Sequence, residues 1–185
     1  TGYARDGGTS GLGTYQTSLD LARAFGVSIE TVDIVPSVEQ IFSVIGFTPD
    51  FSKGLQPVIF ENDQAWTRTL ILLSKACFLG GFVLGTGDLS ELAQGWCTLF
   101  ADHPLHYGIN VGVAKTLIFY LIQFSRDEVY KTEPHTQTAL TAVLDTAVSP
   151  ELQPLSASGA LTHKTEELIG PRGLNDFYLY YLVRF

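Results

Sequence analysis

Residues 85–92 read GTGDLSEL and directly follow the apolar segment FVL at positions 82–84. A short apolar segment that ends in a Gly-X-Gly turn is typical of a buried strand. Asp88 and Glu91 have the spacing of an N-cap residue and its reciprocal partner in a capping box at the start of a helix. The stretch therefore predicts a strand, a loop and a helix in succession, a unit that is typical of α/β folds with parallel strands.

Apolar side chains recur at helical spacing over most of the rest of the chain. We expect helices in the ranges 15–25, 38–45, 61–76, 115–124, 136–144 and 176–185. A further strand is expected over 29–35, where β-branched residues precede Pro36. The predicted fold class is α/β, with a parallel sheet flanked by helices and a helical C-terminal part. Ligands of such folds bind beyond the carboxyl ends of the strands.

The expected helix over 61–76 has two distinct faces. Its apolar side chains recur at helical spacing and predict a buried stripe, namely Trp66, Leu70, Leu73 and Cys77. Its polar side chains share another face and are Glu61, Gln64 and Arg68. We therefore expect the apolar stripe to pack into the core and the polar face to be available to a ligand.

The composition indicates a soluble globular domain. The 185 residues fit one domain, and 45% of them are hydrophobic against 16% charged. The net charge of −8, without a basic run, argues against a nucleic-acid partner. The apolar stretches are shorter than the roughly 20 residues that span a bilayer, and the N-terminus has no signal-peptide pattern. We expect a cytoplasmic protein without a membrane anchor, in which Cys77 and Cys97 are reduced thiols.

Two interpretations of the chemistry of residues 85–92 are open. In the first, helix amides and the hydroxyl of Thr86 bind a nucleotide, and Glu91 binds Mg²⁺, which takes one or two carboxylates beside phosphate oxygens. In the second, Asp88 and Glu91 only cap their helix. The two are compatible, because Asp88 can cap while Glu91 turns outward to a metal. His103 and His106 have no third nitrogen or sulfur ligand nearby, which disfavours a zinc site.

A series of further motifs occurs in a fixed order along the chain. The central ones are GTGDLSELAQGW at 85–96, DH at 102–103, HY at 106–107, Asn110, GV at 112–113 and KT at 115–116. The flanking ones are ENDQA at 61–65, LDT at 144–146, SPEL at 149–152, GP at 170–171 and DF at 176–177. In this order they resemble the synthetase domain of glutamine-dependent NAD synthetases, over almost the whole chain.

The resemblance implies an ATP pyrophosphatase of the adenine nucleotide α-hydrolase class, with a Rossmann-like fold. Such an enzyme adenylates the nicotinate carboxylate of deamido-NAD with ATP, and ammonia derived from glutamine then displaces AMP to give NAD. The implied activity is that of a ligase in NAD biosynthesis that uses ATP and Mg²⁺.

The same resemblance implies roles for individual residues by their position in the motifs. The residues expected to contact ATP are Thr86, Lys115, Thr9 and Ser10. Glu91 is expected to hold Mg²⁺, and Asp102 and Lys115 are expected to act at the reacting centre. The residues expected to bind deamido-NAD are Asn62, Gln64, Arg68, His106, Tyr107 and Asn110.

The chain departs from the family pattern in several places. Trp66 stands where the family usually has an arginine, so a charged fork for phosphate is missing. Ala114 replaces the family's proline before Lys115, so one fixed φ angle is lost. The Ser-Gly-Gly-Leu-Asp-Ser-type pyrophosphate loop is expected to precede Thr1, and the glutaminase domain is not in the sequence. We therefore expect residues 1–185 to be a partial synthetase domain that is inactive alone and takes ammonia from outside this chain.

Two other functions remain open at this level. One is a related ATP pyrophosphatase with another acceptor, such as a GMP synthetase-like amidating ligase or a tRNA-thiolating enzyme, although the acidic charge disfavours tRNA. The other is a non-catalytic assembly module, in which the aromatic helix over 176–185 buries against a neighbouring subunit. We expect the protein to form a homo-oligomer.

Overall fold

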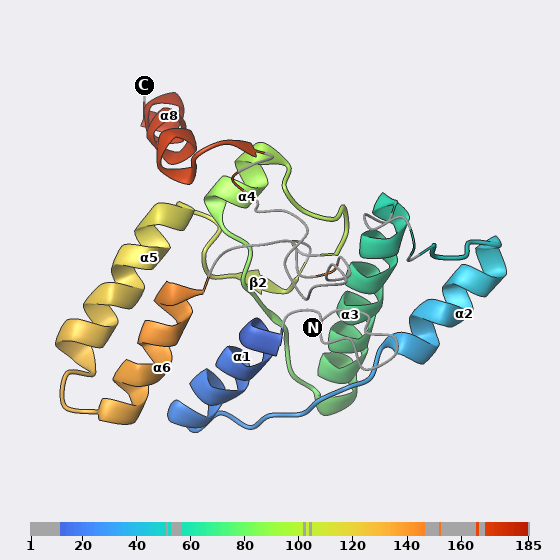
Figure 1. Cartoon of the computed structure of the whole chain (residues 1–185), viewed down its shortest axis with the longest axis horizontal. Coiled ribbons are helices and arrows are strands. Elements are labelled where there is room, and N and C mark those ends of the chain that lie inside the picture. Colours follow the sequence, from blue (N-terminus) through green and yellow to red (C-terminus); the bar gives the residue numbers. More distant parts are fainter. Residues whose placement is uncertain are drawn as a thin grey trace.

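The computed structural model describes residues 12–50, 52, 57–101, 103, 105–146, 152, 166 and 169–184 (Figure 1). Its elements in chain order are α1 (Leu12–Ala24), α2 (Val35–Ile45), α3 (Val58–Leu79), β1 (Leu84–Gly85), α4 (Leu89–Gln94), β2 (Tyr107–Gly108), α5 (Lys115–Phe124), the π-helix η2 (Ser125–Val129), α6 (Pro134–Asp145) and α8 (Arg172–Arg184). Every helix expected from the sequence is present, with ends that differ by a few residues, and α5 has the predicted bounds.

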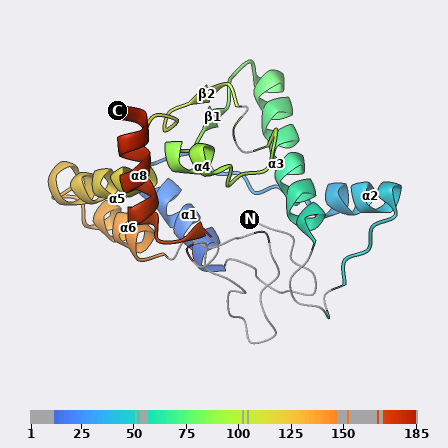
Figure 2. The same ribbon diagram turned by 90° about the horizontal axis from the view of Figure 1, so that it is seen from above.

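The two strands and α4 lie between two groups of helices (Figures 1 and 2). On one side, α1 and α5 both pack against α6, and on the other side α2 packs against α3. α8 contacts α4 and α5, so it joins the middle of the molecule to the first group. This arrangement brings the start of α4, the start of α5 and α8 into one neighbourhood.

β1 and β2 form a parallel pair, as the fold prediction requires. Leu84 pairs with Tyr107, and Gly85 pairs with Gly108. His106 strengthens the pairing, because its Nδ1 accepts the Val83 N–H at 3.0 Å. A parallel pair sends both carboxyl ends to the same edge, so the loops that follow β1 and β2 leave the sheet together.

The best-buried apolar cluster lies between α2 and α3. Its fully buried members are Ile34, Val38, Phe42 and Phe60. The rings of Phe42 and Phe60 stack with centroids 6.0 Å apart, and Phe47 meets Phe42 edge-on at 4.9 Å. These ring pairs fix α2 against the N-terminal half of α3.

The strand expected over 29–35 does not form in the structure. Residues 27–34 form neither a strand nor a helix, and Val35 already belongs to α2. Asp33 explains the early helix start, because its Oδ1 accepts the Val35 N–H at 2.9 Å. β-branched residues form a strand only beside a partner, and β1 pairs with β2 alone among the described residues.

The predicted faces of α3 are exchanged in the structure. Leu70 is 66% exposed and Cys77 is also exposed, whereas Gln64 is fully buried. Four of the buried positions of α3 are polar, and two of these, Gln64 and Thr69, are satisfied by backbone carbonyls. For example, the Thr69 hydroxyl donates to the Ala101 carbonyl at 2.7 Å, and the Gln64 amide donates to the Phe60 carbonyl at 2.8 Å.

Cys77 and Cys97 are both solvent-exposed, and neither is part of a disulfide among the described residues. Within the described ranges, each helix is either too short or too polar to cross a lipid bilayer.

Candidate functional site

The candidate site is built on the first turn of α4, which carries a complete capping box. Asp88 Oδ1 accepts the Glu91 N–H at 3.0 Å, and Glu91 Oε2 accepts the Asp88 N–H at 3.2 Å. Asp88 is fully buried. The structure therefore confirms the capping interpretation of these two residues. Glu91 does not turn outward, as the combined interpretation required, because its side chain completes the capping box. One oxygen of each carboxylate is left for another partner.

That partner is Lys115, the first residue of α5. Its Nζ lies 2.5 Å from Asp88 Oδ2 and 2.5 Å from Glu91 Oε1. Burial on its own lowers the pKa of Lys115, but the hydrogen bonds and charges of Asp88 and Glu91 outweigh this effect and raise the pKa above its ordinary value. Lys115 is therefore a firmly protonated ammonium held between two carboxylates at the sheet edge.

The backbone of Lys115 is held from the same turn of α4. Ser90 Oγ accepts the Lys115 N–H at 2.9 Å and donates to Asp176 Oδ1 at 2.5 Å. The other oxygen of Asp176 accepts the Thr116 N–H at 2.8 Å. Sequence reasoning missed Ser90 and Asp176 as site residues, and the only signal was their occurrence inside quoted motifs.

Gly87 admits His103 to the loop between β1 and α4. A Cβ atom at position 87 would collide with the His103 imidazole ring, so only glycine fits without displacement. Both His103 nitrogens are buried, and neither has a hydrogen-bond partner within the described ranges. Thr86, expected to contact ATP, is exposed one position earlier, at the carboxyl end of β1.

α3 is joined to the loop 98–101 by a row of hydrogen bonds. The Thr98 hydroxyl donates to Asn62 Oδ1 at 2.9 Å, and the Trp66 indole donates to the Leu99 carbonyl at 2.6 Å. Phe100 lies between Leu99 and Ala101, whose carbonyls both accept hydrogen bonds from α3, and it has a left-handed φ of 59°. A non-glycine residue keeps this conformation only where its surroundings enforce it.

The residues expected to bind deamido-NAD lie on two elements. Asn62, Gln64 and Arg68 are on α3; the Gln64 amide donates to the Phe60 carbonyl and to the Leu152 carbonyl at 3.1 Å. Arg68 is half-buried and forms no ion pair with a described residue. His106, Tyr107 and Asn110 lie at and just after β2, where His106 is already bonded to Val83.

Three of the residues predicted from the sequence have no structural description here. Asp102, Thr9 and Ser10 all lie outside the described residues. The structure thus brings Glu91 and Lys115 into direct contact and places Thr86 at the adjacent strand end, while these three stay predictions.

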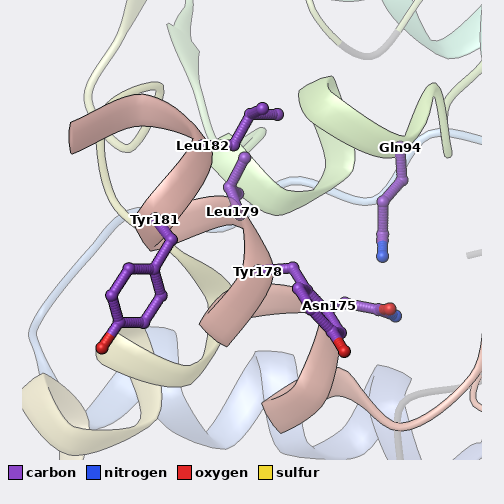
Figure 3. A pocket seen from close by; sticks show the side chains of 6 residues that line it. All are labelled: Gln94, Asn175, Tyr178, Leu179, Tyr181 and Leu182. Carbon is purple, nitrogen blue, oxygen red and sulfur yellow. The ribbon is translucent and has the colours of Figure 1, made fainter. Parts of the chain in front are cut away.

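A separate hollow of about 580 Å³ lies between α4 and α8 (Figure 3). Its lining is mainly apolar and comprises Gln94, Asn175, Tyr178, Leu179, Tyr181 and Leu182. The lining includes no Asp, Glu, Lys, Arg or His, and Asn175 is bonded to the Ile169 carbonyl at 2.9 Å. The hollow therefore lacks the charges that a phosphate-bearing ligand needs, and the candidate site remains at Lys115.

Comparison with known proteins gives the following relatives. A family model described as NAD synthase matches residues 9–139. The glutamine-dependent NAD(+) synthetase of Mycobacterium leprae is 40% identical over 186 residues, and that of Mycobacterium tuberculosis is 38% identical over 184 residues. Both alignments cover 99% of this chain and 27% of the relative. The chain therefore spans about a quarter of the length of these curated relatives.

Solved structures support the predicted fold class. The NMN synthetase from Francisella tularensis aligns with a TM-score of 0.66 and 23% identity, over 90% of this chain and 60% of that one. A glutamine-dependent NAD+ synthetase from Acinetobacter baumannii in complex with ADP aligns with a TM-score of 0.56 and 26% identity, over 69% of this chain and 24% of that one. The helix-rich α/β arrangement with a small parallel sheet is thus a partial Rossmann-like fold.

Proposed function

The chain belongs to the NAD synthase family, and we propose that it forms the nucleotide-binding part of a glutamine-dependent NAD synthetase, a ligase of NAD biosynthesis. In the proposed reaction the nicotinate carboxylate of deamido-NAD attacks the α-phosphorus of ATP, and pyrophosphate leaves. Ammonia then attacks the carbonyl carbon of the adenylate, loses a proton and expels AMP. The carboxylate needs this activation because it is a poor electrophile on its own.

One observation carries the proposal: the Lys115 ammonium lies at the edge of a parallel sheet, 2.5 Å from Asp88 Oδ2 and from Glu91 Oε1. In folds of this kind, ligands bind beyond the carboxyl ends of the strands. A protonated lysine there can neutralise negative charge that builds up on phosphate as pyrophosphate leaves. Lys115 acts in this role, and its carboxylate partners orient it before the nucleotide arrives.

The residues around Lys115 also fit a magnesium ion. Asp88 Oδ2 and Glu91 Oε1 both face the Lys115 ammonium at 2.5 Å, so a magnesium ion held by Glu91 would take the place of that ammonium, which would then turn toward the phosphates. Among the described residues no group of three or more His, Cys, Asp or Glu side chains converges. Magnesium is usually held by one or two carboxylates plus phosphates and water, which matches this donor set. Glu91 holds the ion, which when bound neutralises phosphate charge.

Further roles follow from motif position. Thr86, Thr9 and Ser10 contact ATP, and Asp102 acts beside Lys115 at the reacting centre. The residues that bind deamido-NAD are Asn62, Gln64, Arg68, His106, Tyr107 and Asn110. Trp66 stands where relatives usually carry an arginine and donates to the Leu99 carbonyl instead, so phosphate binding on this face is weaker.

The proposed partners are ATP, deamido-NAD, and ammonia released from glutamine by a domain outside these 185 residues. We place the reaction in the cytoplasm and propose that copies of the protein assemble into a homo-oligomer. Nucleic acid is not a partner, because the net charge is −8.

Calorimetry on the 185-residue chain tests the proposal, with ATP titrated in the presence and absence of Mg²⁺. We expect binding that needs Mg²⁺ and that Lys115→Met weakens about tenfold or more. Lys131→Met is the matched control, because Lys131 is an exposed lysine whose nearest carboxylate, on Glu128, is 4.0 Å away. Equal binding by wild type and Lys115→Met would remove the basis of the proposal.

The acceptor is tested by measuring pyrophosphate release with ATP, Mg²⁺ and ammonium salts. Release that depends on deamido-NAD supports the proposed substrate. Release that depends instead on xanthosine monophosphate, the substrate of a GMP synthetase, would assign the site to another amidating ligase. Efficient NAD formation by this chain alone would refute the expectation that it is inactive without the rest of the protein.

A further inference from the structure

Helix α5 begins at the proposed site without a cap of its own. Its N-cap residue is Ala114, whose methyl side chain cannot accept a hydrogen bond, and no side-chain cap is present at that position. The first N–H groups of a helix have no partner within the helix. At the start of α5 these N–H groups include those of Lys115 and Thr116, so the helix needs hydrogen-bond acceptors from other parts of the chain.

Two buried residues from distant parts of the chain supply those acceptors. Ser90 Oγ accepts the Lys115 N–H at 2.9 Å, and Asp176 Oδ2 accepts the Thr116 N–H at 2.8 Å. Ser90 is 4% exposed and Asp176 is 6% exposed. A carboxylate at a helix N-terminus is also favoured by the helix dipole. Together the two residues replace the missing cap of α5.

The Ser90 hydroxyl is aligned by Asp176. The hydroxyl donates a hydrogen bond to Asp176 Oδ1 at 2.5 Å. A lone pair of Ser90 Oγ is therefore left to accept the Lys115 N–H. Without the carboxylate, the hydroxyl can rotate and this lone pair loses its direction. The position of the Lys115 backbone therefore depends on a side chain from α8.

Lys115 is thus held at both of its ends by the first turn of α4. Ser90 holds the backbone amide, while Asp88 and Glu91 hold the ammonium at 2.5 Å each. A shift of the backbone would move the ammonium relative to both carboxylates. Sub-ångström placement of a charged group matters where it must meet a reacting phosphate.

We propose that Asp176 is a positioning residue of the nucleotide site, which acts through Ser90 to fix the start of α5 and the ammonium of Lys115. The proposal rests on the proposed function for the role of Lys115, but its structural part is independent of any ligand. α8 is then a structural support of the nucleotide site, and disturbance of α8 at Asp176 reaches Lys115 through two hydrogen bonds.

The ligand-free test compares Asp176→Ala, Asp176→Asn, Ser90→Ala and Ser90→Thr in the 185-residue chain. Amide hydrogen exchange is measured at residues 115–118, and the side-chain ammonium of Lys115 is followed by proton–nitrogen NMR and assigned with Lys115→Met. We expect exchange about tenfold or more faster in both alanine variants. The ammonium signal should shift or be lost in the same variants, and Ser90→Thr should restore both readouts because it keeps the hydroxyl.

Asp33→Ala is the matched control. Asp33 also accepts the first N–H of a helix, since its Oδ1 lies 2.9 Å from the Val35 nitrogen, but it serves α2. This variant should leave exchange at 115–118 and the Lys115 signal unchanged. If Asp176→Ala does not fold, Asp176→Asn carries the test, because the amide oxygen can still accept from Thr116 while the charge and the alignment of Ser90 are lost.

Binding of ATP with Mg²⁺ forms the second arm. We expect about tenfold weaker binding for Asp176→Ala and wild-type binding for Asp33→Ala. Unchanged exchange and an unchanged Lys115 signal in folded Asp176 variants would overturn the positioning role, whatever the nucleotide result. A different result is that the Asp176 variants change both the amide exchange and the Lys115 ammonium signal, but the wild-type chain binds no nucleotide. That result would keep the positioning role and contradict the proposed function.

Discussion

Glu91 holds its own helix and Lys115 at the same time: Oε2 accepts the Asp88 N–H at 3.2 Å, and Oε1 lies 2.5 Å from Lys115 Nζ. Capping and ion pairing are therefore not alternatives here, because Oε2 of the carboxylate caps the helix while Oε1 pairs with Lys115. The start of α4 is stabilised by the same side chain that orients the lysine.

Glu91→Gln separates these two roles. The amide oxygen can still accept one hydrogen bond, but the charge opposite Lys115 is lost. We expect the free energy of unfolding to fall by about 1–3 kcal/mol, because one partner of a largely buried, charge-assisted contact is removed. Urea denaturation measures this change. Glu128→Gln is the control, since Glu128 lies in an exposed pair at 4.0 Å and such pairs contribute about 0–1 kcal/mol.

Gly87→Ala tests the close approach of His103. The added methyl group meets the imidazole ring, so we expect a loss of stability of about 1–3 kcal/mol. His103→Ala in the same chain should relieve most of this cost, which a double-mutant cycle detects as coupling. Gly112→Ala is the control, because a Cβ there has no neighbour within 4 Å. The steric explanation would be contradicted if Gly87→Ala and Gly112→Ala lowered the free energy of unfolding equally. It would also be contradicted if the effects of Gly87→Ala and His103→Ala were additive.

Trp66 tests the departure from the family pattern. Trp66→Phe removes the indole donor to the Leu99 carbonyl, and we expect a loss of stability of about 0.5–1.5 kcal/mol. Trp66→Arg restores a charged fork on this face of α3. If the proposed substrate is correct, Trp66→Arg should bind deamido-NAD on the order of tenfold more tightly than wild type, whereas Trp66→Phe should not. Titration calorimetry distinguishes the two variants.

Asp63 predicts a pH-dependent stability. The residue is 3% exposed, its Oδ2 has no hydrogen-bond partner, and burial raises the pKa of its carboxyl above the ordinary 3.8. A raised folded-state pKa means that Asp63 stabilises the fold when protonated below 3.8 and that this stabilisation is lost as pH rises through the raised pKa. Asp63→Asn should therefore be more stable than wild type at neutral pH.

The gain from Asp63→Asn should shrink as the pH is lowered toward 3.8, where wild-type Asp63 also becomes neutral. Urea denaturation of both proteins across this range measures the difference. A gain that stays constant with pH would show that packing, and not charge, is responsible.

Local signals in the sequence predicted the elements that depend only on nearby residues. The spacing of Asp88 and Glu91 predicted the capping box, and the apolar pattern that starts at Lys115 predicted α5 with its observed bounds. Both features depend on residues only a few positions apart, so a short segment of sequence is enough to predict them. The direct contact between Glu91 and Lys115 was not predicted, since the resemblance implied only a metal role for one and an ATP role for the other, and 24 positions separate them.

Features that depend on distant partners could not be predicted in this way. Residues 29–35 have strand composition, but the described sheet gives them no neighbour to pair with. Buried Thr69 of α3 is satisfied by the Ala101 carbonyl of loop 98–101, and no periodicity of α3 reveals this distant acceptor. Asp176 accepts a hydrogen bond from the first turn of a helix 60 positions away. Sequence rules for helix caps consider only residues next to the helix end, so they do not predict this contact.

The acids around Lys115 outnumber it, because Asp88 and Glu91 both contact its ammonium and Asp176 lies two hydrogen bonds from its backbone N–H. A bare triphosphate that diffuses toward this place meets stronger net repulsion than a metal-chelated one, whose negative charge is smaller. The order of arrival is thereby biased: the metal enters first or together with the nucleotide. Nucleotide capture should accordingly speed up with added magnesium before any chemistry begins.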